Sequence, residues 1–126
     1  MPDLIVPSRF CGPPSSGNGG WSAGALAAHA GDDCPEDHAR AWPVVSVSLH
    51  APPPLDVPMP VARAADGGVI ASYDGRPVLT AARTHDEVLD VAPVGPDEAR
   101  AAQASYAGLG SHPFPTCFSC GTAREA

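Results

Sequence analysis

Lysine is absent from this chain of 126 residues, and all seven of its cationic side chains are arginines. Aspartate and glutamate together number 14, so the formal net charge at pH 7 is −7. A protein that binds nucleic acid without sequence preference needs a basic face to neutralise phosphates. The charge balance therefore argues against a general nucleic-acid-binding function.

Long apolar runs are also missing. No stretch approaches the ~18 apolar residues that mark a membrane-spanning helix. The N-terminal segment MPDLIVPSRF lacks the charged start and long apolar core of a secretory signal peptide. Four cysteines in a chain without an export signal are expected to be reduced thiols rather than a disulfide framework. We therefore expect a cytoplasmic protein with no membrane partner.

Several catalytic motifs do not occur. The chain has no Gly-x-Ser-x-Gly elbow, no phosphate-binding loop and no His-Glu-x-x-His pair. These absences argue against a serine hydrolase and a catalytic metal site, and no cofactor is expected.

Glycine (13 residues) and proline (16 residues) are abundant, while 44% of the residues are hydrophobic. That apolar content is enough to form a core, so we expect one folded domain with proline-rich loops. Within it, the stretch SSGNGGWSAGALAAHAG predicts a helix over residues 19–30. Ser15, Ser16 or Asn18 would cap its start and Gly31 would end it. Its small side chains would let a sheet approach closely.

The predicted strands follow the helix. Residues 44–50 alternate valine or leucine with polar residues, which predicts a strand with one buried face. Asp-Gly turns at 66–68 and 74–75 predict three strands in a meander. Two shorter strands are expected at 4–10, where Pro7 imposes an edge or a bend, and at 87–93.

Three further segments have no strand pattern. Residues 32–42 are expected to form a polar, acidic loop. Residues 96–107 predict a short helix with Pro96 at its first position. The tail from residue 111 has no periodicity and is expected to be extended or partly disordered.

The segments RFCGPPSSGNGGWSAGALAAHA and VVSVSLHAPPPLDVPMPV together resemble the first module of bacterial thioesterase-like hotdog proteins. The similarity is to acyl-CoA thioesterases that carry two hotdog modules, and HPFPTCFSCG resembles the segment that joins their modules. The resemblance implies an α+β fold, with a single hotdog module in residues 1–95 whose central helix packs on a curved antiparallel sheet. Residues 96–126 would be a short helix and a linker-like tail.

The resemblance also implies a site at the helix start. In hotdog enzymes, backbone N–H groups there polarise a thioester carbonyl, and the positions that match are Asn18, Gly19 and Gly20. Trp21 and Leu26 would line the acyl channel. The implied ligand is acyl-CoA or another acyl thioester, bound between the subunits of a homodimer or against a second hotdog module.

A catalytic base is not evident in the sequence. Residues 11–31 contain no carboxylate, and Asp56, Asp66, Asp74 and Glu87 lie elsewhere, mostly in turns. In two-module thioesterases the catalytic polar residues lie largely in the second module. Two readings therefore stay open: hydrolysis of an acyl thioester, and a non-catalytic acyl-binding or assembly module.

The pentapeptide CFSCG raises a third reading. Cys117 and Cys120 have the spacing of one zinc knuckle, for which Cys11, Cys34 and His112 are the available additional ligands. A redox dithiol and a reduced loop pair without function are the alternatives.

Overall fold

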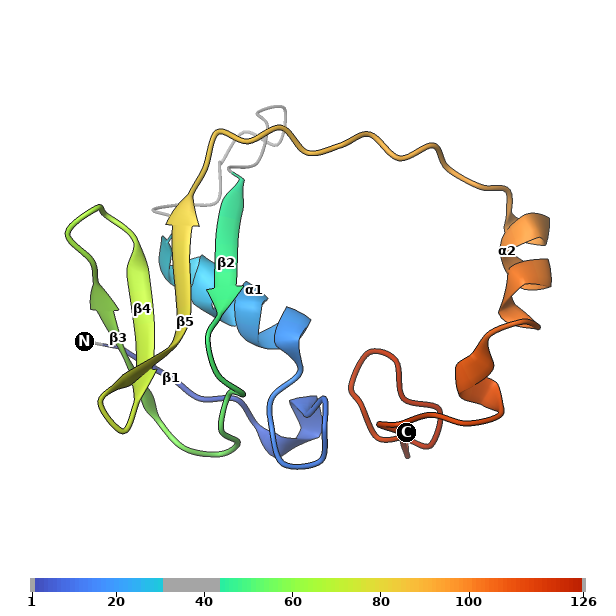
Figure 1. Cartoon of the computed structure of the whole chain (residues 1–126), viewed down its shortest axis with the longest axis horizontal. Coiled ribbons are helices and arrows are strands. Elements are labelled where there is room, and N and C mark those ends of the chain that lie inside the picture. Colours follow the sequence, from blue (N-terminus) through green and yellow to red (C-terminus); the bar gives the residue numbers. More distant parts are fainter. Residues whose placement is uncertain (1, 31–43, 126) are drawn as a thin grey trace.

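The computed structural model describes residues 2–30 and 44–125, which form an α+β fold with two α-helices and one five-stranded antiparallel sheet (Figure 1). In chain order the elements are β1 (Asp3–Leu4), a 3₁₀ turn η1 (Ser8–Phe10), α1 (Gly19–Ala30), β2 (Val45–Leu49), β3 (Met59–Arg63), β4 (Val69–Tyr73), β5 (Arg76–Arg83), α2 (Pro96–Gln103) and a second 3₁₀ turn, η2 (Ala107–Leu109). None of the helices in this part of the chain has the length and apolarity to cross a membrane. The expected loop over 32–42, Gly31 and Cys34 lie outside the described residues.

The sheet has the order β1-β3-β4-β5-β2, with β1 and β2 at its edges. The predicted meander is confirmed as β3, β4 and β5, joined by the two Asp-Gly turns. Asp74 and Gly75 both have positive φ, at 50° and 71°. Asp56, outside this turn, also has a positive φ of 58°. Two successive positive φ angles are what a tight hairpin turn of the primed type requires.

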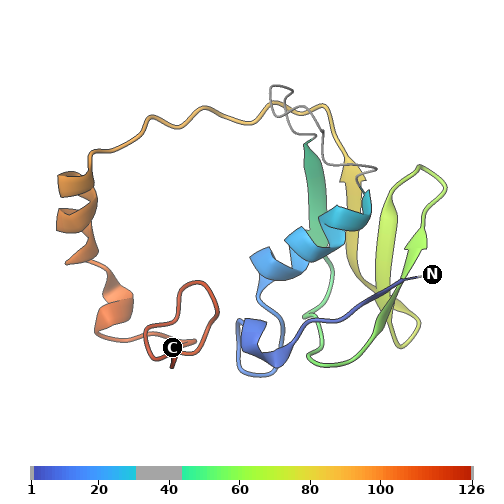
Figure 2. The same cartoon turned by 180° about the vertical axis from the view of Figure 1, so that it is seen from behind.

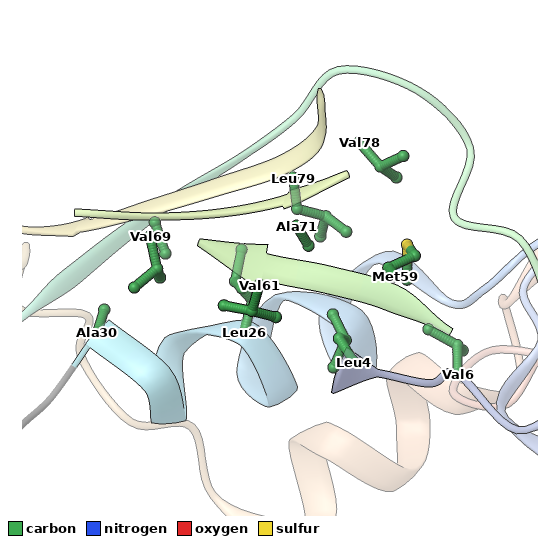
Figure 3. Close-up of a cluster of buried hydrophobic side chains, with 11 residues drawn as sticks. Leu4, Val6, Leu26, Ala30, Met59, Val61, Val69, Ala71, Val78 and Leu79 are labelled. Atoms are coloured by element: carbon green, nitrogen blue, oxygen red, sulfur yellow. The ribbon is translucent and has the colours of Figure 1, made fainter. Parts of the chain in front are cut away.

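The core lies between α1 and one face of the sheet (Figure 3). Helix α1 buries Ser22, Leu26 and Ala30, which are four residues apart and so lie on one side of the helix. Leu26 and Leu79 are both fully buried. The helix with small side chains that the sequence predicted over 19–30 is thus observed. The hydroxyl of Ser22 has no hydrogen-bond partner among the described residues.

The first strand is much shorter than expected over 4–10. It ends at Leu4, and residues 8–10 form the turn η1 instead. Pro7, immediately before this turn, has no N–H to donate to a ladder, which explains why pairing does not continue. Val6 makes only an isolated bridge to Leu55.

The expected strand over 87–93 is wrong. Residues 84–95 run from β5 to α2 without secondary structure, and apolar side chains such as Leu89 and Val91 are 86% and 87% exposed. Apolar residues form a strand only where a partner strand and a covering layer exist, and no described element supplies either one to this segment. Both views show the segment leading to α2 at a distance from the sheet (Figures 1 and 2).

The helix expected over 96–107 begins at Pro96, as predicted, but ends at Gln103. Its residues are all exposed, so no packing extends it.

The tail is folded, contrary to the expectation of an extended or disordered segment. It returns to the N-terminal loop, where the backbone N–H of Phe118 donates to the carbonyl of Cys11 at 2.7 Å. The ring of Phe118 meets that of Phe10 edge-on, with centroids 4.8 Å apart. Arg124 donates from Nη2 to the carbonyl of Arg9 at 2.7 Å. We call residues 106–125 the C-terminal segment.

Candidate functional site

The start of α1 is built by Asn18. Its Oδ1 accepts the backbone N–H of Trp21 at 2.9 Å, which is the geometry of a helix N-cap. Its own backbone N–H donates to the carbonyl of Phe10 at 2.8 Å, so the turn η1 fixes the cap in place. Of the three capping candidates in the sequence, Asn18 is the one that caps.

Gly19 and Gly20 present backbone N–H groups at this helix start. The first N–H groups of a helix have no acceptor within the helix, and no other described residue accepts a hydrogen bond from these two. Gly20 is exposed and Gly19 half-buried. The position of Gly19 and Gly20 at the start of a helix is therefore confirmed, while their catalytic role stays a prediction.

Apolar side chains flank this terminus. Trp21 is half-buried and stacks on Phe10 with ring centroids 4.5 Å apart and an interplanar angle of 13°. Leu49, at the end of β2, is 46% exposed, and its Cδ2 lies 3.5 Å from where a Cβ on Gly19 would be. Leu26 differs, because it is fully buried in the core. Its role as a substrate contact stays a prediction, whereas Leu49 offers surface at the site.

The C-terminal segment brings Cys117 to the same place. Asn18 donates from Nδ2 to the Sγ of Cys117 at 3.5 Å and to the Oγ of Ser119 at 3.0 Å. Cys117 is only 5% exposed, whereas Cys120 is exposed. The structure therefore unites two features that the sequence left apart, the Asn-Gly-Gly helix start and the CFSCG motif.

The environment of Cys117 favours its thiolate. Hydrogen bonds from the Cys120 thiol and backbone, and from Ser119, lower the pKa of Cys117 from 9.0 to about 6, although burial opposes them. The same thiol–thiol hydrogen bond raises the pKa of Cys120. The lowered pKa favours the thiolate of Cys117, which lies beside the positive end of the α1 dipole.

The carboxylates considered in the sequence do not reach this site. Asp56 accepts the N–H of Ser8, 48 residues earlier, at 2.9 Å, and Asp66 accepts that of Gly68 in its own turn at 2.9 Å, so both stabilise backbone away from Asn18. Asp74 lies in a hairpin turn and Glu87 in the exposed segment after β5. Within the described ranges, no carboxylate hydrogen-bonds Asn18.

Sequence reasoning missed Ser119, and it considered Cys117 only as a metal ligand or redox thiol and not as a neighbour of Asn18. CFSCG was visible as a motif, but nothing in its spacing indicated that it would contact Asn18, 99 residues earlier. For the metal reading, residues 2–30 and 44–125 contain no group of three or more His, Cys, Asp or Glu side chains suited to an ion. Cys11 lies nearby, yet its Sγ donates to the carbonyl of Thr116 at 3.4 Å.

A pocket lies elsewhere in the described part of the chain, on the sheet. It has a volume of about 290 Å³ and is lined by outward-facing residues of the sheet, including Ser46, Ser48, Ile70 and Thr80. These positions alternate with residues buried against α1, so the pocket lies on the opposite face from the helix.

No protein-family model, curated protein or solved structure significantly matches this chain.

Proposed function

We propose that this chain is a hotdog-type module that binds acyl thioesters of coenzyme A and hydrolyses them as a homodimer or beside a second hotdog module. The observation that carries the proposal is the pair of backbone N–H groups on Gly19 and Gly20, which have no acceptor among the described residues. Such donors stabilise the oxyanion that develops when a thioester carbonyl is attacked. Trp21 and Leu49 supply apolar surface beside them for an acyl chain.

The order of elements supports the proposal, since a strand and a helix are followed by a run of antiparallel strands packed on that helix. The edge strand β2 supports dimer formation. It hydrogen-bonds β5 on one side, and no described strand pairs with the row of backbone groups on the other. A second copy paired there would extend the sheet and place a second surface against the start of α1.

Removing one N–H without disturbing the helix tests this function. Proline is favoured at the first helical position, which Gly19 occupies, and it has no N–H to donate. Gly19→Ala is the matched control, because its Cβ would meet Leu49 at an ordinary 3.5 Å and the N–H remains. Thiol release would be followed over short, medium and aromatic acyl-CoAs, with the solution mass measured for each variant.

We expect the wild-type chain and Gly19→Ala to release coenzyme A, and Gly19→Pro to be slower by about 10²–10³, the usual cost of one oxyanion donor. Equal turnover in the proline and alanine variants would contradict the role of this N–H. A chain that neither binds nor hydrolyses any acyl-CoA would refute the proposed function altogether.

A binding module without turnover is the second candidate. It is favoured by one observation, that no carboxylate hydrogen-bonds Asn18 in the described part of the chain. Acyl-CoA binding that Gly19→Pro weakens, with no thiol released by any variant, would identify this function.

A further inference from the structure

The CFSCG motif holds its two cysteines on one turn. The backbone N–H of Gly121 donates to the carbonyl of Cys117 at 3.0 Å, and the hydroxyl of Tyr106 donates to the carbonyl of Cys120 at 3.1 Å. A Cβ on Gly121 would overlap the carbonyl oxygen of Pro115 and the backbone of Cys117. Glycine is therefore required for the turn to close over Cys117.

The two thiols differ in their exposure to solvent and in their hydrogen bonds. Cys120 is exposed and open to a reagent, whereas Cys117 is buried and receives hydrogen bonds from Asn18 and Cys120. A buried thiolate within hydrogen-bonding reach of an exposed cysteine is suited to attack that cysteine once a reagent has bonded to it.

We propose that Cys117 and Cys120 form a reversible dithiol–disulfide pair, which low-molecular-weight disulfides oxidise through Cys120. The geometry rests on the Cys-x-x-Cys turn, the exposure of Cys120 and the contact of Cys117 with Asn18. This pair is independent of the proposed acyl-thioester function.

The chemistry proceeds in two exchanges. The sulfur of Cys120 attacks one sulfur of the reagent disulfide while its proton passes to the Cys117 thiolate, and one reagent thiolate is expelled. That expelled thiolate takes the proton from Cys117, and the regenerated Cys117 thiolate attacks the sulfur of Cys120, forming the Cys117–Cys120 bond and expelling the second thiolate. The pair loses two electrons and one proton, water protonates the second expelled thiolate, and the reagent is reduced to two thiols.

Cys11 does not complete a competing site. Its buried thiol donates a hydrogen bond to the carbonyl of Thr116, and no cluster of three metal-ligating side chains exists in residues 2–30 and 44–125. A zinc knuckle would need two further ligands. The recorded contacts therefore favour a two-cysteine reaction over a metal site.

The sequence offers a clean experiment. Trypsin cleaves after Arg100 and Arg124, so residues 101–124 form one peptide that contains Cys117 and Cys120 and no other cysteine. Cys11 and Cys34 fall together in residues 10–40. The reduced full-length chain would be incubated with oxidised glutathione, quenched in acid, alkylated, digested and analysed by mass spectrometry.

We expect the 101–124 peptide to lose two hydrogens, to resist alkylation and to recover on reduction with dithiothreitol. Chymotryptic cleavage after Phe118 should leave its two halves joined. Cys117→Ser should accumulate a glutathione adduct on Cys120, and Cys120→Ser should stay fully alkylatable. Cys11→Ser is the matched control and should form the disulfide as the wild type does.

Three results would overturn the proposal. The first is full alkylation of both cysteines in excess oxidised glutathione. The second is a glutathione adduct on Cys117 in the Cys120→Ser variant, which would make Cys117 the point of entry. The third is stoichiometric zinc that the reduced chain retains through gel filtration and that blocks oxidation, which would establish the metal site instead.

Discussion

The side-chain amide of Asn18 links the start of α1 to Cys117. Its oxygen caps α1, and its Nδ2 donates a hydrogen bond to the Cys117 sulfur at 3.5 Å. The helix start and the C-terminal segment are therefore coupled through a single residue. Substitutions of Asn18 can remove the Nδ2 donor alone or the donor and the capping oxygen together.

Asn18→Asp retains an oxygen for the cap and loses the donor, while Asn18→Ala loses both. We expect Asn18→Ala to lower the free energy of unfolding by about 1 kcal/mol through the cap. Asn18→Asp should retain the cap and raise the pKa of Cys117, because a carboxylate would face its thiolate. Denaturant unfolding and the pH dependence of Cys117 alkylation measure the two effects. Equal loss of helix stability in both variants would contradict the capping role.

The lowered pKa of Cys117 makes folding depend on pH. In the folded chain it is about 6, against an ordinary value of 9.0 for the unfolded thiol. The stabilisation from this group is thus fully present above about pH 9 and is lost as the pH falls through about 6. Cys120, whose pKa is raised, acts in the opposite sense above about pH 9.

We therefore expect the difference in unfolding free energy between the wild type and Cys117→Ser to grow as the pH rises from about 6 to about 9. Chemical denaturation across that range is the measurement. A difference that stays constant with pH would show that Cys117 has the same pKa in both states.

Leu26 and Leu49 separate a core role from a ligand role. Leu26 is fully buried, so Leu26→Ala should lower the unfolding free energy by about 2–5 kcal/mol. Leu49 is 46% exposed, so Leu49→Ala should change stability by only about 0.5 kcal/mol. Under the proposed function it should instead weaken acyl-CoA binding. The reverse pattern, a mild Leu26→Ala and a strongly destabilising Leu49→Ala, would contradict this assignment.

Two glycines near the site should respond oppositely to alanine. A Cβ on Gly17 would lie 2.8 Å from the Oγ of Ser22 and 2.9 Å from a methyl of Val6, so Gly17→Ala should destabilise the chain by about 1–3 kcal/mol. Gly24 lies on the exposed side of α1 with nothing within 4 Å, and Gly24→Ala should stabilise it by about 1 kcal/mol. Thermal unfolding distinguishes the two, and a stabilising Gly17→Ala would refute the close packing described here.

The parts of the fold that the sequence predicted are those encoded locally. Asn18 caps α1 by accepting the N–H of Trp21, only three residues away, and Asp74-Gly75 closes a hairpin between neighbouring strands. A short window of sequence therefore contains the information that each feature needs. The helix over 19–30 and the meander followed from such windows, whereas the α+β class was an expectation from the resemblance. The length of the first strand did not, because its pairing depends on β3, more than fifty residues later.

The sequence predicted the part of the candidate site at the helix start but not the part that the C-terminal segment contributes. Asn18, Gly19 and Gly20 were identified at the helix start, but the contact of Asn18 with Cys117 spans 99 residues. The C-terminal segment is built from turns whose hydrogen bonds follow no period, so no pattern indicated where it would dock. The strand expected over 87–93 failed for a related reason, since a short apolar segment says nothing about whether a partner strand is present.

The exposed connection over 84–95 has a consequence for how the C-terminal segment is held. Among the described residues before this connection, the polar and aromatic contacts of the C-terminal segment fall on Arg9, Phe10, Cys11 and Asn18. It therefore behaves as a tethered ligand of its own chain, with an effective concentration on the order of millimolar. Losing one of these contacts shifts the docked fraction while the core stays folded, and a free peptide of the same sequence competes only when it approaches that concentration.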